Sequence, residues 1–203
     1  MDIVLASKNT AKLAELAAIL AEVAPGVRLV EAGWPDVDET GDTFEENALL
    51  KAHAAHAASG TMALADDSGI EVDALDGAPG VRSARFAGED AGDAANLNLL
   101  IERMRGVTDR SARFRCVVAI VGEGPDGARV VETAEGCVEG NLRSEPVGDV
   151  GFGYDPLFEP LGWDRTFAEV PAAEKATISH RGEALRGAAE LLAKMQVTEH
   201  PRA

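Results

Sequence analysis

The chain has 203 residues, of which 46% are hydrophobic and 27% charged, a composition typical of a folded globular protein. Its 35 acidic residues outnumber its 19 Lys and Arg residues, so the formal net charge is −16. A surface this acidic repels a nucleic-acid backbone, and the sequence has no basic stripe. We therefore expect no nucleic-acid polymer as a partner, and we expect a few clustered cations or a divalent metal to meet any polyanionic ligand.

The first half of the chain alternates predicted strands and helices. Residues 2–6 are apolar and rich in β-branched side chains, which predicts a buried strand. The apolar spacing of residues 12–23 predicts a helix that is capped by Asn9 or Thr10 and ends at residues 25–26, a Pro-Gly pair.

A second helix is predicted from Thr43, whose spacing to Glu46 is that of a capping box, to about residues 59–60. Residues 61–65 then predict a strand that ends at the polar sequence of residues 66–69. Each predicted strand of this half therefore leads directly into a polar segment.

The second half contains one further helix, a hairpin and a final helix. Asp93 is expected to cap the first of these helices. Residues 112–121 and 128–140 predict two antiparallel strands joined across the turn sequence of residues 122–127. Ser179 is expected to cap the last helix. The elements together predict an α/β fold with a mixed sheet.

No targeting or membrane-spanning segment is expected. The longest apolar stretches, such as Cys116–Val121, are far shorter than the roughly 20 residues that cross a bilayer, and the N-terminus lacks a signal-peptide pattern. Cys116 and Cys137 have neither metal-site spacing nor the density of a disulfide scaffold. We therefore expect a cytoplasmic protein. Because no repeat or long linker divides the chain, we also expect a single domain over residues 1–203.

The first polar segment lies at a predicted strand-to-helix junction. Helix N-termini offer free backbone N–H groups and a positive dipole end, both of which suit phosphate. The alternative is an ordinary helix cap with an exposed lysine, and the segment lacks the glycines of a P-loop. The residues are Ser7, Lys8, Asn9, Thr10, Ala11 and Lys12.

The second polar segment carries two adjacent acids, Asp66 and Asp67, followed by Ser68 and Gly69. Successive strand residues point to opposite faces, so only one of the two acids is expected to face a given site. Carboxylate oxygens suit Mg²⁺, whose shell is commonly completed by water and substrate phosphates. The alternative is a simple Asp-Ser-Gly turn.

A further acidic cluster precedes the second predicted helix, and Glu39 is its favoured candidate for a second metal ligand. The alternative is a solvated loop, which is the usual role of a charge cluster. The cluster consists of Asp36, Asp38, Glu39 and Asp42.

Residues 148–158 form a glycine-rich segment that holds Phe152 and Tyr154, two members of a small aromatic set. Glycines permit unusual backbone angles and close approach of a ligand. Aromatic side chains in such a loop predict a stacking platform for a flat ligand such as a base. The alternative is a tight loop anchored by buried aromatics.

Lys175, His180 and Arg181 form the densest cationic group of the chain. Arg suits bidentate hydrogen bonds to phosphate or a carbonyl edge, and Lys acts as a point charge. The alternative is a solvated helix face on which these cations pair with Glu174 and Glu183.

Six segments in order resemble one family, the inosine/xanthosine triphosphate pyrophosphatases. Departures are small: Val150 stands where Gly is common, and Ser7 where Thr is also usual. The segments are SKNTAKLAEL, ETGDTFEENALLKA, ADDSGIEVDAL, GAPGVRSARFAG, VGFGYDPLF and EKATISHRGEAL.

The resemblance implies an elongated α/β fold with a mixed central sheet and two lobes flanking an active-site cleft, commonly as a homodimer. It also implies Mg²⁺-dependent hydrolysis of ITP, dITP and XTP between the α- and β-phosphates. The products are the monophosphate and pyrophosphate, and the reaction cleanses the nucleotide pool.

By the same resemblance, Asp67 is the general base and a metal ligand, and Glu39 is a second acidic ligand. Asp66 either assists the metal or faces away. Residues 7–12 hold the phosphates, and Ser68 lies beside the nucleotide. The residues that line and complete the base pocket are Phe152, Gly153, Tyr154, Asp155, Lys175, His180 and Arg181.

Two other functions remain open from the residues alone. A metal-dependent phosphatase acting on small phosphorylated metabolites needs the same acidic pair but no base pocket. A non-catalytic nucleotide sensor binds nucleotide without releasing pyrophosphate, and it leaves the paired acids without a purpose.

Overall fold

The computed structural model describes residues 1–197 of the chain. The regular elements, in chain order, are β1 (Asp2–Leu5), α1 (Thr10–Val23), β2 (Arg28–Val30), α2 (Phe44–Ser59), β3 (Met62–Val72), η1 (Asp73–Leu75), η2 (Gly80–Arg85), α3 (Asp93–Arg103), β4 (Ser111–Glu123), β5 (Arg129–Leu142), β6 (Phe158–Pro160), η3 (Phe167–Glu169), α4 (Ala172–Ile178) and α5 (His180–Val197). None of the helices in this part of the chain is long and apolar enough to cross a membrane.

The strands form one mixed six-stranded sheet in the order β2-β1-β3-β4-β5-β6. Strand β1 pairs in parallel with both β2 and β3, whereas β5 and β6 are antiparallel. Strands β4 and β5 are neighbours joined by a tight turn, in which the Gly124 N–H donates to the Ala128 carbonyl oxygen over 2.8 Å. A connection this short joins antiparallel strands, so the predicted hairpin and the α/β class with a mixed sheet are confirmed.

The chain divides into two compact units, which are described separately below. Unit 1 consists of residues 1–67, residues 116–136 and the chain from residue 181 onward. Unit 2 consists of residues 68–115 and 137–180.

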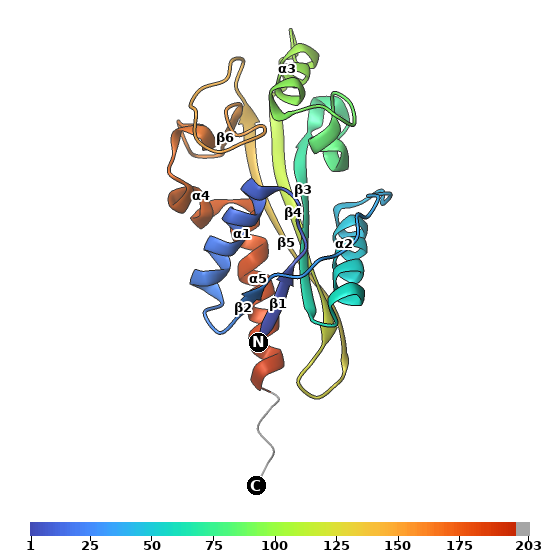
Figure 1. Ribbon diagram of the computed structural model, residues 1–203. Helices are drawn as coiled ribbons and strands as arrows, with labels where there is room; N and C mark the ends of the chain where they lie inside the picture. The colour runs from blue at the N-terminus through green and yellow to red at the C-terminus, as the bar shows by residue number, and fades with distance from the viewer. Residues whose placement is uncertain (198–203) are drawn as a thin grey trace. The chain divides into compact units, whose positions relative to one another are not determined.

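The helices of unit 1 begin as their sequence predicts. The Asn9 side chain accepts a hydrogen bond from the Lys12 N–H over 3.1 Å and caps α1. Thr43 and Glu46 form the expected capping box at the start of α2. Figure 1 shows α1 and α5 on one side of the unit 1 strands and α2 on the other side.

The core of unit 1 consists of apolar strand and helix residues, among them Ile3, Leu16, Leu20, Leu64 and Ile120. Cys116 in β4 belongs to this core and is fully buried. Helix α2 is unusual because its buried face includes two polar side chains, Asn47 and Lys51. Polar side chains on a buried helix face need polar partners, and these two find them on β3.

Unit 2 is organised around three phenylalanines. The ring centroid of Phe114 lies 4.7 Å from that of Phe158 and 6.1 Å from that of Phe167. Helix α3 packs Leu100 into the same cluster. The prediction that Asp93 caps this helix is wrong, because Gly92 occupies the cap position and Asp93 is the first helical residue. The Asp93 carboxylate instead accepts a hydrogen bond from the Gly153 N–H over 3.0 Å.

Strand β3 is longer than its sequence suggests. The predicted end at residues 66–69 is wrong, because the strand continues through them to Val72. The two acids do not end the strand because neighbouring helices supply cations to both, so neither needs bulk water. The simple Asp-Ser-Gly turn is excluded by the same observation.

Gly69 permits the close approach of η2 to β3. A Cβ atom at this position would lie 2.3 Å from Ser83 Oγ and 2.5 Å from the Gly80 carbonyl oxygen. The same Ser83 hydroxyl accepts a hydrogen bond from the Ile70 N–H over 2.9 Å.

We predict that Gly69→Ala lowers the free energy of unfolding by about 2 kcal/mol, because the methyl group forces the Ser83 turn away from the strand. Urea denaturation measures the effect. Gly33→Ala is the matched control, since nothing lies within 4 Å of an added Cβ there. Equal stability of the two variants would contradict the proposed close packing.

Candidate functional site

Residues 7–12 connect β1 to α1, as predicted. Thr10 and Ala11 are exposed in the first turn of the helix, and Ser7 is half-buried. An ordinary helix cap is present, as the alternative interpretation expects, but the lysine of that alternative is not exposed. The Lys12 side chain is only 15% exposed, and its Nζ lies 3.5 Å from Asp66 Oδ2.

Asp66 and Asp67 occupy successive positions of β3 and are both buried. Successive strand residues face opposite sides of a sheet, so each acid meets a different set of helices. Asp66 contacts cations from α1 and α5, whereas Asp67 contacts side chains from α2. The two acids therefore contact different groups, as expected for adjacent residues of a strand.

Asp66 holds together the α1 and α5 side of unit 1. Arg181 Nε lies 3.6 Å from Asp66 Oδ2, on the same carboxylate oxygen that faces Lys12. Arg181 Nη1 also donates to Glu15 Oε2 over 3.0 Å. Arg181 is thus buried between two acids, so the alternative of a solvated helix face does not describe it.

Asp67 faces a different set of groups. Its Oδ1 accepts a hydrogen bond from Lys51 Nζ over 3.2 Å, and its Oδ2 accepts one from Asn47 Nδ2 over 3.2 Å. Lys51 Nζ also donates to Glu39 Oε1 over 2.6 Å. The two acids expected to bind metal, Glu39 and Asp67, therefore converge on a single ammonium group.

The charges around Asp67 change its proton affinity. Burial raises the pKa of Asp67, and the negative charges of Glu39 and Asp66 add to the rise, while Lys51 and Lys12 oppose it. The net shift is upward. Burial also disfavours the charged form of Lys51, but its attractions to Asp67, Asp66 and Glu39 prevail and raise its pKa. Lys51 therefore stays an ammonium, whereas Asp67 is a stronger base than an ordinary aspartate.

The donor atoms at this position fit a hard divalent cation. Glu39 and Asp67 supply carboxylate oxygens, which Mg²⁺ prefers. A cation already lies between them in the form of the Lys51 ammonium, which shows that the local charge favours a positive group. Among residues 1–197 no three His, Cys, Asp or Glu side chains are grouped to hold a metal alone. Mg²⁺ is commonly bound by one or two carboxylates, with water and substrate phosphates as its other ligands, so two protein ligands are enough.

The glycine-rich segment of unit 2 is shaped by its own side chains. Gly148, Gly151 and Gly153 all have positive φ angles, as the glycine pattern predicts. A Cβ on Gly151 would lie 2.2 Å from Asp155 Oδ2, so this glycine leaves the room that the carboxylate occupies. That carboxylate accepts a hydrogen bond from the Phe152 N–H over 3.0 Å.

Lys175 forms a buried ion pair with Asp155, with Nζ 2.7 Å from Oδ2. Its Nζ also lies 5.3 Å from the ring centroids of both Phe152 and Phe167. The alternative of a solvated lysine does not describe Lys175, which is 4% exposed, whereas the neighbouring Glu174 pairs with Arg165. Lys175 thus links the glycine-rich segment to α4.

The two aromatics of the segment differ in their surroundings. Tyr154 is 5% exposed, and its hydroxyl donates to the Ser83 carbonyl oxygen over 2.8 Å. Burial raises the pKa of that hydroxyl, so it remains a donor. This matches the alternative of a loop anchored by a buried aromatic. Phe152 is half-buried and remains a candidate for stacking.

His180 and Ser68 complete the predicted set. The His180 ring stacks on Phe114 with centroids 4.7 Å apart and an interplanar angle of 8°, and the residue is 1% exposed. Ser68 is half-buried within β3. Unit 1 thus contains the phosphate and metal candidates together with Arg181, whereas unit 2 contains Ser68 and the other base-pocket candidates.

The sequence interpretation missed Asn47 and Lys51, which hold Asp67. A signal was available, since both lie on the otherwise alanine-rich buried stripe of α2, with Ala48, Ala52 and Ala55. Polar residues on a buried stripe indicate a polar partner across the interface, but the pattern does not say which one.

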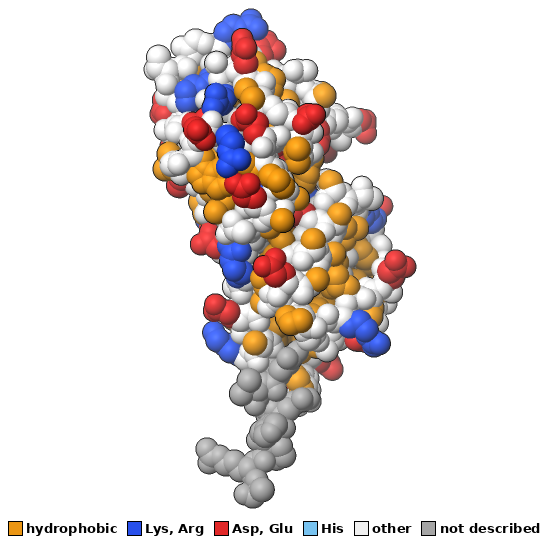
Figure 2. Space-filling model, turned by 90° about the vertical axis from the view of Figure 1, so that its left-hand side faces the viewer, with side chains coloured by type: hydrophobic (Ala, Val, Ile, Leu, Met, Phe, Trp, Pro, Cys, Tyr) orange, Lys and Arg blue, Asp and Glu red, His pale blue; other side chains and the backbone are white. Residues whose placement is uncertain are grey.

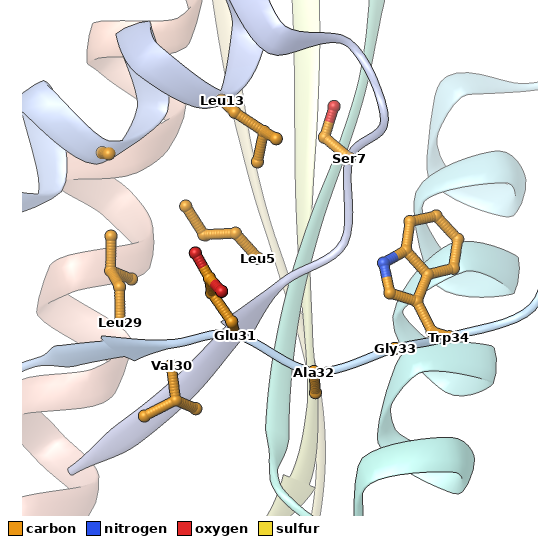
Figure 3. Close-up of a pocket in the computed structure, with 10 residues that line it drawn as sticks. Leu5, Ser7, Leu13, Leu29, Val30, Glu31, Ala32, Gly33 and Trp34 are labelled. Atoms are coloured by element: carbon orange, nitrogen blue, oxygen red, sulfur yellow. The ribbon is translucent and has the colours of Figure 1, made fainter.

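A pocket of about 690 Å³ lies beside the connection between β1 and α1 in unit 1. Its lining is mostly apolar, with Ser7, Glu31 and Trp34 as the polar or aromatic exceptions (Figure 3). Leu5 and Leu13 form one side, and the chain that follows β2 forms the other. On the face shown in Figure 2, Lys and Arg side chains alternate with Asp and Glu and form no continuous basic stripe.

These features define a class: a mixed-sheet α/β protein whose central strand carries buried carboxylates flanked by lysines, an arrangement suited to metal-assisted phosphate chemistry. The family model described as "Ham1 family" matches residues 3–191.

Two similar proteins are named dITP/XTP pyrophosphatase, and two similar solved structures are described as Ham1 proteins. The dITP/XTP pyrophosphatase of Streptomyces coelicolor is 50% identical over 91% of this chain and 93% of its own length. That of Bacillus licheniformis is 46% identical over 94% and 97%. The solved structure of a HAM1 protein from Coxiella burnetii is 42% identical, with a TM-score of 0.83, and covers 96% of this chain and 99% of its own. A Staphylococcus aureus Ham1 structure gives 38% identity, a TM-score of 0.81 and the same coverage.

The chain belongs to the Ham1 family. The resemblance to triphosphate pyrophosphatases is therefore confirmed at the level of the family.

We predict that Asp66→Asn lowers the free energy of unfolding by about 3 kcal/mol, because it leaves the charges of Lys12 and Arg181 close together without their shared acid. Chemical denaturation measures the loss. Glu22→Gln, which removes an exposed acid from α1, should change stability by less than about 0.5 kcal/mol. Similar small effects in both variants would show that Asp66 is not a structural anchor.

Proposed function

We propose that this protein hydrolyses ITP, dITP and XTP between the α- and β-phosphates, with Mg²⁺, to the monophosphate and pyrophosphate, and so removes these nucleotides from the pool. The observation that carries the proposal is the convergence of Asp67 and Glu39 on Lys51 within 3.2 Å and 2.6 Å. The names of the relatives, dITP/XTP pyrophosphatases, support the substrate class.

Asp67 is proposed as the general base. Its buried carboxylate and raised pKa make it a stronger proton acceptor than an exposed aspartate. It would take a proton from the attacking water, a contribution worth about 10²–10⁴-fold in rate. Asn47 and Lys51 fix the orientation of the carboxylate through one hydrogen bond to each oxygen.

The developing negative charge of the leaving pyrophosphate needs fixed positive groups. Lys12 lies beside Asp66 and Lys51 beside Asp67, and cations already in position would cost no reorganisation during the reaction. Glu39 and Asp67 would hold Mg²⁺, which when bound supplies Lewis-acid neutralisation of the phosphates.

The proposed substrate contacts are those expected from the sequence. Residues 7–12, Ser7 to Lys12, would hold phosphates through their backbone N–H groups and the Lys12 side chain. Ser68 would lie beside the nucleotide. The groups proposed to line and complete the base pocket are Phe152, Gly153, Tyr154, Asp155, Lys175, His180 and Arg181.

The cations proposed for the substrate already have acidic partners. Lys12 faces Asp66, Lys175 is bound to Asp155, and Arg181 has acids on two sides. Lysine and arginine each carry several N–H donors, so these cations would donate to the 6-oxo group of a base or to phosphate while the acids hold them in place. We further propose that the chain acts as one domain, as a homodimer, in the cytoplasm, and without a nucleic-acid partner.

The deciding experiment incubates the protein with Mg²⁺ and ITP, dITP, XTP, ATP or GTP and measures pyrophosphate and orthophosphate separately. We expect pyrophosphate from the first three, with much slower reaction of ATP and GTP. Orthophosphate alone would indicate the metal-dependent phosphatase, and nucleotide binding without release would indicate the sensor. Equal rates on ATP would overturn the proposed substrate class.

We predict that Asp67→Asn lowers kcat by at least about 100-fold, because the amide cannot accept the proton. Circular dichroism and thermal melting should show a folded protein. Near-normal turnover would remove Asp67 from its proposed role.

We predict that kcat/KM rises with pH through the raised pKa of Asp67, because the base must be ionised. Lys51 lowers that pKa, so Lys51→Met should move the acidic limb of the profile to higher pH in addition to lowering the rate. A pH profile on ITP measures the limb in both proteins. A limb that stays in place or moves to lower pH would contradict the assigned contact.

A further inference from the structure

The segment that carries Glu39 has little regular structure. Residues 31–42 connect β2 to α2 and contain no helix or strand. The position of Glu39 therefore depends on contacts on both sides of it: those of the preceding residues, and the hydrogen bond that the Gly41 N–H donates to Asn47 Oδ1 over 2.8 Å.

The first part of this segment does not pack closely on α1. Residues 31–34 line the pocket of about 690 Å³ together with Leu13 and Ala17 of α1. In Figure 3 the Trp34 ring lies at the rim of this space, on the side of Ser7. A hollow of this size removes the van der Waals contacts that would otherwise fix a loop.

One lysine ties the segment to the connection between β1 and α1. Lys8 Nζ forms an ion pair with the Asp36 carboxylate. The same Nζ lies 5.2 Å from the centroid of the Trp34 ring, within the range of a cation–π contact. A single ammonium thus contacts Trp34, which lines the pocket, and Asp36, which follows it in the segment.

A second lysine holds the segment three residues later, where Lys51 donates to Glu39. Three residues of extended chain reach at most about 10 Å, so fixing Asp36 restricts the positions open to Glu39. We name the contacts of Lys8 with Trp34 and Asp36 the Lys8 latch.

We propose that Trp34 and Asp36 are positioning residues, which through the Lys8 latch keep Glu39 where it can bind the divalent metal. The inference rests on the proposed function, in which Glu39 is a metal ligand. Neither residue touches substrate or metal in this account, and both act through the placement of the segment.

The expected size of the effect follows from the exposure of the contacts. The side chains of Lys8 and Asp36 are 50% and 89% exposed, so the ion pair is weak and screened by salt. An exposed cation–π contact is of similar strength. Loss of either contact should therefore weaken metal binding by about two- to fivefold, and loss of both by up to about tenfold.

The test compares Asp36→Asn, Trp34→Leu and the double variant with Asp38→Asn, which removes an equal charge from the same segment. The first measurement is hydrogen exchange of residues 33–40 in metal-free protein. The second is the Mg²⁺ concentration that gives half-maximal pyrophosphate release from ITP. We expect faster exchange and a two- to tenfold higher Mg²⁺ requirement in the latch variants, with kcat at saturating Mg²⁺ near the wild-type value.

Added NaCl should reduce the difference between wild type and Asp36→Asn in both measurements, because it screens the exposed ion pair. Latch variants that match Asp38→Asn in exchange and Mg²⁺ requirement would overturn the proposal. Failure of the proposed function is distinct, because wild-type protein would then release no pyrophosphate at any Mg²⁺ concentration. In that case, faster hydrogen exchange in the latch variants than in Asp38→Asn would still support the Lys8 latch as a structural contact. Its role in positioning a metal ligand would be rejected.

Discussion

The alternation of side chains along β3 is the constraint on which the unit 1 site depends. Because successive residues face opposite sides, Asp66 and Asp67 have different ion-pair and hydrogen-bond partners, although they are adjacent in sequence and the charge of Asp66 still raises the pKa of Asp67. Asp66 forms ion pairs with Lys12 and Arg181 on one side of β3, and Asp67 forms an ion pair with Lys51 on the other side. A one-residue shift of the strand would exchange these partners and place each acid among the wrong helices.

The two acids also differ in what their charge does for the protein. The pKa of Asp67 is raised in the fold, so its contribution to stability is present at low pH and is lost as pH rises through that raised value. Its ionised form at neutral pH is therefore kept against stability, a pattern typical of functional groups. The pKa of Lys51 is raised as well, so its contribution to stability is present at neutral pH and is lost only as the solution becomes strongly basic.

Local signals predicted much of the fold. The Asn9 cap, the Thr43–Glu46 capping box and the hairpin depend on neighbouring residues, and all are present. The predicted end of β3 at residues 66–69 was wrong because the groups that stabilise the charge of Asp66 come from distant parts of the sequence. Lys51 was missed for the same reason, since its role exists only when α2 packs on β3. The family resemblance named Asp67 and Glu39 as candidates, whereas the Lys8 latch depends on contacts that no local pattern contains.

The central claim is that Asp67 is a desolvated carboxylate whose charge is balanced by Lys51. Carbon-13 NMR of carboxyl-labelled aspartate in metal-free protein, with Asp67→Asn used to assign the signal, measures its titration directly. The account predicts a pKa above the ordinary value of 3.8 and a further rise when Lys51 is replaced by Met. A carboxyl that titrates at or below 3.8, or that is indifferent to Lys51, would contradict it.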